Sequence, residues 1–330
     1  MGMWLRPANL VALSDDGGRQ LGLDGSKPEV AHTSCESSRK ISKKRSVIDF
    51  VIRNRIHLWP GAVLLIWALP PWYGSTPAWI ALPSVLLVGF GLYQLNRVFD
   101  LVEDQVNDPD AHARTAAGRN MIRNVAISAL LASLVLSIVL LSFAATALLA
   151  VILLPGVLYS IPFLHREPGD LHRLKQVPGL KNAIPSVVWP VTTILYPAVS
   201  RPGVHELPLA VAVTAVACSI FTIEVSWDIR DSFGDRFAGI RTLATRFGLD
   251  RALVVPFVFS CAEALVIVLL IFADELSARW LLPAILLVLL PAVAYLWRTS
   301  LASNRDRSHL LVLMNISALI PLGVVGRWMV

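Results

Sequence analysis

Three side chains that carry oxygen donors follow a long apolar segment at intervals of four residues: Asn96, Asp100 and Asp104. Residues four apart on an α-helix lie on nearly the same face. The two carboxylates repel each other unless a cation lies between them, and Mg²⁺ prefers such oxygens and commonly shares them with substrate phosphates. The spacing therefore indicates a magnesium site, although an acidic helix end in contact with solvent would have the same composition.

A second acidic segment repeats this spacing. Asp231 and Asp235 are four residues apart, and Glu224 lies seven residues before Asp231, two turns away on the same face. Both aspartates follow their counterparts in the first segment by 131 residues. We expect the two acidic faces to lie opposite each other at one level of a helical bundle. Each would bind Mg²⁺, and a diphosphate would bridge the ions.

The segments that must position these residues are long and apolar. Of 330 residues, 55 % are hydrophobic and 16 % are charged, whereas about a quarter of a soluble domain is charged. Several apolar runs reach the roughly 20 residues that a helix needs to cross the hydrocarbon core of a bilayer. The sequence therefore predicts an all-α, polytopic membrane protein with nine transmembrane helices, some kinked by proline, at about 57–73, 78–99, 122–143, 145–163, 183–200, 206–227, 251–273, 280–297 and 309–328.

Lysine and arginine residues indicate the orientation of this bundle. All but three of the 29, namely Arg201, Arg279 and Arg327, fall in segments on one side of the predicted membrane. Basic residues accumulate on the cytosolic side, so we predict a multi-pass protein of the cell membrane with its N-terminus and acidic motifs on the cytosolic side. The net charge of +6 therefore reflects topology, and we expect no nucleic-acid partner.

The polar N-terminal segment contains no apolar signal sequence near its start. Its composition is typical of disorder. We therefore predict a disordered cytosolic tail at 1–48, followed by a transmembrane domain at 49–330.

Basic residues near the acidic segments suit a bound diphosphate, because further positive charge stabilises it as a leaving group. Arginine favours bidentate contacts with phosphate, and lysine favours point contacts. The basic flank of a membrane-spanning helix would supply the same residue types without any ligand. The predicted diphosphate contacts are Arg97, Arg173, Lys175, Lys181 and Arg236, with Arg166, Arg230 and Arg241 nearby.

Polar and aromatic side chains within the spans indicate what the bundle interior holds. Glu263 and Asn315 lie in the middle of apolar spans, and a carboxylate at that depth usually faces a cavity or a partner. Glu263 is a candidate to orient an acceptor or take a proton, although a hydrogen bond between helices would also explain it.

Aromatic residues within the spans could also line a substrate cavity. Aromatic faces attract cations, although packing against lipid would place aromatic residues here too. The predicted substrate-cavity residues are Tyr93, Tyr159, Trp189, Trp227 and Glu263, with Tyr196 as a further candidate.

The combination of motifs resembles the UbiA-type intramembrane prenyltransferase superfamily over about residues 50 to 328. The shared features are N-x3-D-x3-D after the second span, D/E-x6-D-x3-D after the sixth, and a Y-S-x-P turn after the fourth. The resemblance implies a nine-helix bundle around a central cavity, capped by cytosolic loops. It also implies Mg²⁺-dependent binding of an isoprenyl diphosphate. By this resemblance the metal ligands are Asn96, Asp100, Asp104, Asp231 and Asp235, with Glu224 in place of the usual upstream aspartate.

The sequence departs from the superfamily pattern at one position. Many members carry Y-x3-K after the fourth span, but here Tyr159 is followed at that spacing by Phe163. The first lysines after Tyr159 are Lys175 and Lys181. Which basic residue contacts the diphosphate therefore stays open.

These features favour transfer of an isoprenyl group from its diphosphate to an aromatic or other lipophilic acceptor. A membrane terpene cyclase would use the same acids without an acceptor. A cation transporter is disfavoured because transporter sites usually lie near the bilayer midplane, whereas these motifs lie at one membrane face. A head-group transferase also uses paired aspartates and Mg²⁺, but its compact signature within one segment is absent from this sequence.

Overall fold

A computed structural model describes residue 51 and residues 56–167, 170–177 and 179–328. All of these residues belong to one compact unit of the chain. The tail predicted at 1–48 lies outside the described residues.

Seven helices in the described part of the chain are long and apolar enough to cross a bilayer. Each has at least 18 residues, which approaches or exceeds the length needed to span the hydrocarbon core. Their positions agree with seven of the predicted spans, so the chain is built as a multi-pass membrane protein. They are α3 (Leu82–Phe99, continued from a 3₁₀ turn at Trp79–Ala81), α6 (Arg119–Leu140), α7 (Phe143–Ser160), α10 (Glu206–Phe237), α12 (Val254–Phe272), α13 (Leu281–Leu296, which reaches 18 residues only together with a 3₁₀ turn at Ala278–Trp280) and α15 (Arg305–Trp328).

The other two predicted spans, 57–73 and 183–200, are interrupted at or directly after proline residues. Proline has no backbone N–H to donate, and its ring clashes with the preceding helical turn. Neither span is one continuous α-helix, so the predicted count of nine transmembrane helices is not confirmed. The interrupted spans comprise α2 (Trp59–Ala68) with a 3₁₀ turn at Pro70–Tyr73, and α8 (Leu180–Pro190) with a π-helical turn at Val191–Leu195 and α9 (Tyr196–Val199).

Shorter elements connect the long helices. The prediction of an all-α bundle is confirmed, but the segment between α7 and α8 contains two short antiparallel strands that the sequence did not predict. The strands are β1 (Leu164–Glu167) and β2 (Asp170–His172), and the short helices are α4 (Leu101–Asn107), α5 (Pro109–Ala117), α11 (Leu243–Ala252) and α14 (Arg298–Ser303).

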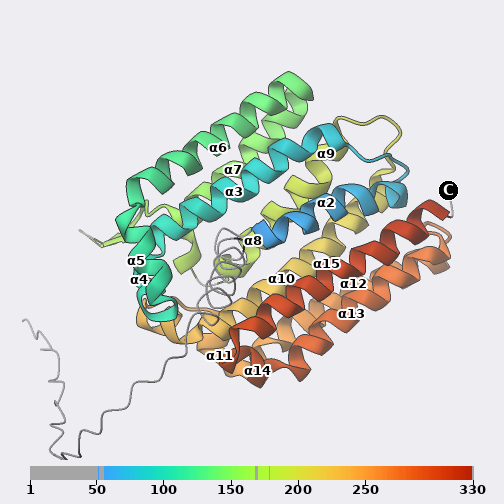
Figure 1. The fold of residues 1–330 in the computed structure, drawn as a ribbon. Helices are drawn as coiled ribbons and strands as arrows, with labels where there is room; N and C mark the ends of the chain where they lie inside the picture. The colour runs from blue at the N-terminus through green and yellow to red at the C-terminus, as the bar shows by residue number, and fades with distance from the viewer. Residues whose placement is uncertain (1–50, 52–55, 168–169, 178, 329–330) are drawn as a thin grey trace, which may run out of the picture. The chain divides into compact units, whose positions relative to one another are not determined.

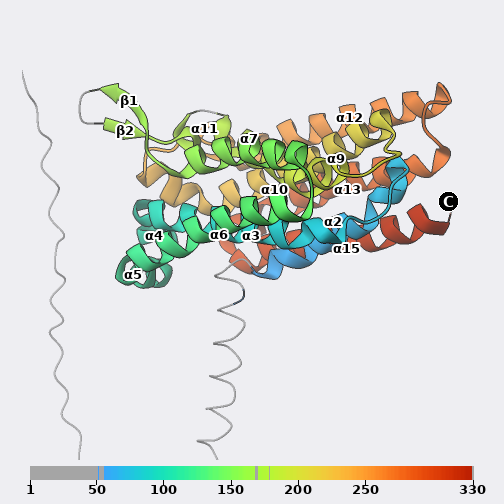
Figure 2. The same ribbon diagram turned by 90° about the horizontal axis from the view of Figure 1, so that it is seen from above.

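The long helices run alongside one another, with the short helices gathered at one end (Figures 1 and 2). Helix α3 packs against α6 and α7, and α10 packs against α8, α12, α13 and α15. Helix α15 also packs against α2. The connections α4, α5 and α11 lie at one end of the bundle, and α9 lies at the other. Residues that follow α3 and residues near the end of α10 are thereby brought to the same end.

Large apolar side chains cover the outside of the bundle as well as filling its interior. Val88 and Leu149 are fully buried in a cluster formed by α3, α6 and α7. Phe143 and Phe272, by contrast, are 80 % and 82 % exposed. A soluble protein rarely exposes apolar surface on this scale, so the outer surface is suited to lipid.

Candidate active site

The first acidic motif lies where α3 passes into α4. Asp100 has a backbone conformation that ends α3 (φ −92°, ψ 14°), yet its amide donates to the carbonyl oxygen of Asn96 at 2.9 Å. The amide of Asp104 likewise donates to the carbonyl oxygen of Asp100 at 2.8 Å. The helical repeat therefore continues across the break and brings further residues to the same side. The first acidic stripe comprises Asn96, Asp100, Glu103, Asp104 and Asn107.

The second acidic motif lies within the uninterrupted helix α10. Successive intervals of four, three and four residues place its side chains along one face. The second acidic stripe comprises Glu224, Asp228, Asp231 and Asp235. Asp228 and Asp235 are each only 2 % exposed, so this stripe faces the protein interior.

The two stripes meet where α4 packs against α10. The backbone amide of Gly234 donates to Oδ1 of Asn107 at 3.1 Å. A Cβ atom on residue 234 would lie 2.3 Å from Nδ2 of Asn107, so the close approach depends on glycine. Beside this contact is a cavity of about 350 Å³, here named the polar cavity, and all residues of both stripes line it. The two motifs, far apart in the sequence, thus share one space.

Basic residues from the segment after the hairpin reach the first stripe. Arg173 donates from Nη1 to Oδ1 of Asp100 at 2.9 Å and from Nη2 to Oε1 of Glu103 at 2.6 Å. Lys175 contacts the same two oxygen atoms, and its Nζ lies 2.9 Å from Glu103. Burial acts to raise the pKa of Glu103, but the positive charges of Lys175 and Arg173 outweigh it and lower the pKa to about 2. Glu103 is therefore ionised and bound to two buried cations.

Lys181, in the first turn of α8, reaches the second stripe. Its Nζ lies 2.8 Å from Oδ1 of Asp228 and 2.6 Å from Oδ2 of Asp235. Arg230 is paired with Asp231 at 2.5 Å. Both stripes are therefore partly neutralised by cations that belong to the chain itself.

Asp104 lies among like charges. Burial, and then the charge of Asp100, raise the pKa of Asp104 to about 7. Among the residues that the structure describes, no three His, Cys, Asp or Glu side chains converge closely enough to hold a metal ion. Most of the carboxylates contact arginine or lysine instead. The donors themselves, carboxylates with an amide oxygen from Asn96, match the preference of Mg²⁺ for hard oxygen ligands.

The remaining predicted diphosphate contacts differ in position. Arg97 lines the polar cavity and donates to Gln94 at 3.2 Å and to Thr115 at 3.1 Å. Arg236 is exposed near the end of α10 and does not line the polar cavity. The structure therefore brings Arg97, but not Arg236, to the predicted site.

The prediction that Glu263 lines the substrate cavity disagrees with the structure. Its Oε1 accepts a hydrogen bond from the hydroxyl of Thr214 at 2.6 Å, which links α12 to α10. Glu263 lines neither the polar cavity nor the apolar one described next. A hydrogen bond between helices is the alternative explanation of Glu263 that the sequence left open.

Tyr196, a further candidate for the substrate cavity, is fully buried in the core and also lines neither cavity.

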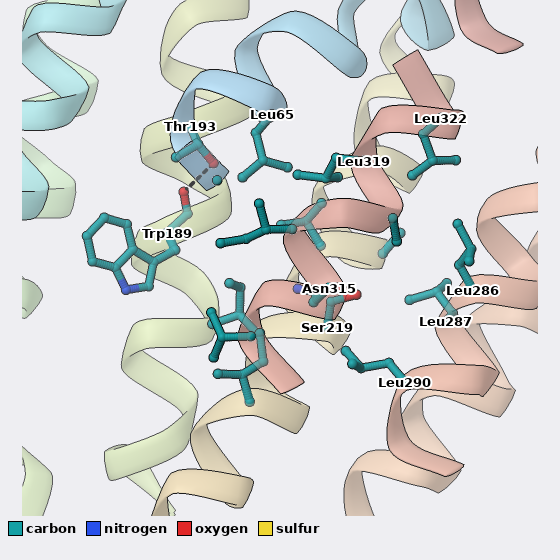
Figure 3. Close-up of a pocket in the computed structure, with 18 of the residues that line it drawn as sticks. Leu65, Trp189, Thr193, Ser219, Leu286, Leu287, Leu290, Asn315, Leu319 and Leu322 are labelled. Atoms are coloured by element: carbon teal, nitrogen blue, oxygen red, sulfur yellow. Dashed lines mark hydrogen bonds between the residues drawn. The ribbon is translucent and has the colours of Figure 1, made fainter. Parts of the chain in front are cut away.

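A second cavity, of about 360 Å³ and here named the apolar cavity, lies between α2, α10, α13 and α15 (Figure 3). It shares four lining residues with the polar cavity: Tyr93, Trp189, Glu224 and Trp227. Tyr93 and Trp189 are stacked, with ring centroids 5.3 Å apart. Tyr159 lines the polar cavity alone. The predicted aromatic residues thus lie mainly at the boundary between the polar cavity and the apolar cavity.

Sequence reasoning overlooked Glu103 and Asp228. A different alignment of the two motifs, with an offset of 128 residues, would have revealed both. It matches four residues of each stripe rather than two aspartates from each, and leaves Asp104 opposite Ser232. The aligned pairs are Asn96 with Glu224, Asp100 with Asp228, Glu103 with Asp231, and Asn107 with Asp235.

Residues 57–319, most of the chain, match the UbiA prenyltransferase family. The chain therefore belongs to this family, as its two acidic motifs predicted.

Individual relatives agree with this assignment. A digeranylgeranylglyceryl phosphate synthase from Natronomonas pharaonis is 31 % identical over 179 residues, which are 54 % of this chain and 59 % of that protein. The match therefore covers less than two thirds of the relative's length.

Solved structures show the same fold. A structure of digeranylgeranylglyceryl phosphate synthase aligns with a TM-score of 0.57 at 17 % identity, over 86 % of this chain and 99 % of that one. A UbiA homologue from Archaeoglobus fulgidus, bound to GPP and Mg²⁺, aligns with a TM-score of 0.58 at 14 % identity. That alignment covers 84 % of this chain and 99 % of the homologue. The fold of the described bundle is thus that of UbiA proteins.

Proposed function

We propose that this protein is a Mg²⁺-dependent prenyltransferase that moves an isoprenyl group from its diphosphate to a lipophilic acceptor. The observation that carries this proposal is the shared wall between a cavity lined by two acidic stripes and a cavity lined by apolar residues. An amphiphilic substrate would place its charged head in the first and its chain toward the second. Family membership supports the proposal, as does the Archaeoglobus homologue bound to GPP and Mg²⁺.

Magnesium would be held by the carboxylates that converge on the polar cavity. Bound Mg²⁺ would neutralise the negative charge that develops on the departing diphosphate. The buried position of the second stripe keeps its oxygen atoms directed into the cavity rather than into solvent. The proposed ligands are Asn96, Asp100 and Asp104 from the first stripe, and Glu224, Asp228, Asp231 and Asp235 from the second.

Lys175 and Lys181 would bind the diphosphate while keeping their carboxylate partners. A lysine ammonium group has three N–H donors. Each of these lysines contacts two carboxylates, Lys175 on the first stripe and Lys181 on the second. One donor on each remains for a phosphate oxygen. Arg173, in contact with Asp100 and Glu103, would hold the first stripe in place and add positive charge.

Side chains at the boundary of the two cavities would control the chemical step. The allylic C–O bond breaks, its electron pair goes to the diphosphate oxygen, and the carbocation is captured by a nucleophile on the acceptor, which loses a proton. The faces of Tyr93, Trp189 and Trp227 would stabilise the positive charge where it forms. The apolar walls beyond them exclude the water that would otherwise capture the carbocation.

Transfer to an acceptor is favoured over cyclisation of the prenyl chain by the likeness to a digeranylgeranylglyceryl phosphate synthase. That name describes a product with two geranylgeranyl chains on a glyceryl phosphate, and therefore a lipid acceptor. The distribution of lysine and arginine supports a cytosolic N-terminus, with the polar cavity at the cytosolic face.

The proposal is tested with purified protein in lipid nanodiscs. Dimethylallyl, geranyl and geranylgeranyl diphosphates are each supplied with Mg²⁺, with and without geranylgeranylglyceryl phosphate, and diphosphate release is measured. We expect release that requires both Mg²⁺ and the acceptor. Equal release after chelation of every divalent ion would refute the role of the metal, and a cyclic product without acceptor would identify a cyclase.

A further inference from the structure

Two polar side chains that belong to neither acidic stripe project into the apolar cavity. Asn315 comes from α15 and Ser219 from α10, and leucine side chains surround them (Figure 3). Leu286, Leu290 and Leu319 belong to the same lining. A carboxamide and a hydroxyl therefore interrupt a wall that is otherwise suited to hydrocarbon.

Neither side chain hydrogen-bonds to another residue within the part of the chain that the structure describes. Other hydroxyls nearby behave differently. On α10, Thr222 donates to the carbonyl of Cys218 at 3.1 Å and Ser226 to that of Thr222 at 2.7 Å. Both side chains are half-buried and open to the cavity, so a ligand that fills the cavity without hydrogen-bonding to them would leave each polar group unpaired at a cost of about 1–3 kcal/mol. Two such groups in one cavity point to a ligand that supplies the missing partner.

The position of Ser219 along α10 locates that partner. With a rise of 1.5 Å per residue, Ser219 lies about 7 Å from Glu224, at the boundary of the two cavities. It lies about 13 Å from Asp228, in the second acidic stripe. The apolar lining continues to Ala212, about 10 Å further on. The ligand therefore carries its polar group between a reactive end near Glu224 and an apolar chain that extends toward Ala212.

We propose that Asn315 and Ser219 form a subsite for the acceptor, and that the acceptor is a lipid with an ether, ester or ketone oxygen between its nucleophile and its hydrocarbon chain. The amide of Asn315 and the hydroxyl of Ser219 can both donate to such an oxygen. An isoprenyl chain has no oxygen beyond its diphosphate and cannot supply this partner. The identification of the lipid as the acceptor rests on the proposed function, whereas the preference of the cavity for an oxygen does not.

The preference of the apolar cavity for a ligand with an oxygen atom is measured with two matched probes, heptadecan-9-one and heptadecane, which differ by a central carbonyl oxygen. Each is titrated into nanodiscs that contain the purified protein, without Mg²⁺ or prenyl diphosphate. Binding is followed by intrinsic fluorescence, since Trp72, Trp189, Trp227 and Trp280 line the cavity. We expect the ketone to bind about five- to tenfold more tightly than the alkane, the effect of about one hydrogen bond.

Three variants test whether the two side chains cause this preference. Asn315→Leu should abolish it and tighten binding of the alkane, and Ser219→Ala should reduce it. Thr193→Val is the matched control, because Thr193 lines the same cavity but its hydroxyl already donates to the carbonyl of Trp189 at 2.8 Å. The control should retain the full preference.

An equal affinity of the wild type for both probes would overturn the inference. So would a ketone preference that survives in both Asn315→Leu and Ser219→Ala. Failure of the proposed function has a different signature: no Mg²⁺-dependent release of diphosphate from any donor, whatever the probes show.

Discussion

Apart from Asp104, which only the first contains, the two acidic stripes have the same spacing, but they are built differently. The second lies within one continuous helix, α10, whereas the first crosses the break between α3 and α4. In the alignment at an offset of 128 residues, the first stripe has amides at both ends, Asn96 and Asn107, where the second has Glu224 and Asp235. The second stripe thus carries more negative charge in the aligned positions and has the more rigid backbone.

This difference separates two ways of holding a carboxylate in place. In the second stripe, the helix fixes the position of each acid, and Lys181 only neutralises it. In the first stripe, the backbone is interrupted, and Arg173 and Lys175 join Asp100 to Glu103 across the break. We therefore expect the first stripe to depend on its salt bridges for geometry as well as for charge.

The largest expected effect is the loss of turnover when either stripe loses its most central aspartate. Asp100→Ala and Asp228→Ala should each reduce the rate of diphosphate release at least about 10³-fold, because each removes an anionic ligand at the site of developing charge. Both variants should remain folded in detergent. Asp250→Ala is the control, since Asp250 is exposed and contacts Arg298. A wild-type rate in Asp100→Ala or Asp228→Ala would show that catalysis does not depend on the corresponding stripe.

The next effect concerns stability and is confined to the first stripe. Glu103→Gln should lower the free energy of unfolding by about 2–3 kcal/mol, because Arg173 and Lys175 stay buried with one anionic partner fewer. Thermal unfolding in detergent at neutral pH measures this loss.

The pH dependence of that loss has a definite sign. The pKa of Glu103 in the folded protein, about 2, lies below its ordinary value of 4.5. The carboxylate therefore stabilises the protein above about pH 4.5, and this contribution disappears as the pH falls toward 2. The difference between wild type and Glu103→Gln should shrink at acidic pH, and a constant difference would show that the loss is not electrostatic.

A smaller effect tests the contact that joins the stripes. In Gly234→Ala, the new Cβ would overlap the side chain of Asn107 and separate α4 from α10. We expect a loss of about 1–2 kcal/mol in stability, together with weaker binding of Mg²⁺. Gly118→Ala is a matched control, because its Cβ would meet its nearest neighbour at an ordinary 3.5 Å. An equal effect of both substitutions would mean that α4 does not need to approach α10 closely.

Much of this architecture follows from the sequence alone. Apolar length predicted the seven long helices, and the four-residue spacing placed Asp100 and Asp231 in a shared cavity. The count of nine helices was not confirmed because hydropathy counts apolar residues and cannot show whether a proline segment remains helical. Span 183–200 contains no charged residue, but it includes a π-helical turn.

Other parts of the site could not be read from spacing within one segment. Nothing in its own segment distinguishes Glu103 from an ordinary surface acid, because its partner Arg173 lies 70 positions later in the sequence. Glu263 was assigned to the cavity because it is a carboxylate in the middle of a span, but sequence does not reveal which face of α12 it occupies. Its partner is Thr214 on α10. Pairing between distant segments depends on how the helices rotate about their axes, which only the packed bundle determines.

The smallest expected effect would sharpen the comparison between the stripes most directly. Asp235→Asn gives the second stripe the amide that the first stripe has at Asn107. It removes one anionic partner of Lys181 while leaving Asp228 in contact. The concentration of Mg²⁺ needed for half-maximal diphosphate release should rise about tenfold, the effect of about 1.4 kcal/mol.

The reciprocal substitution is the matched control. Asn107→Asp adds a carboxylate to the first stripe, so it should lower the Mg²⁺ requirement if the aligned positions are equivalent, provided that its contact with the amide of Gly234 is kept. A carboxylate oxygen can accept that hydrogen bond as the amide oxygen does. If both substitutions weaken Mg²⁺ binding, the ends of the two stripes are not equivalent, and the asymmetry between Asn107 and Asp235 is itself required for function.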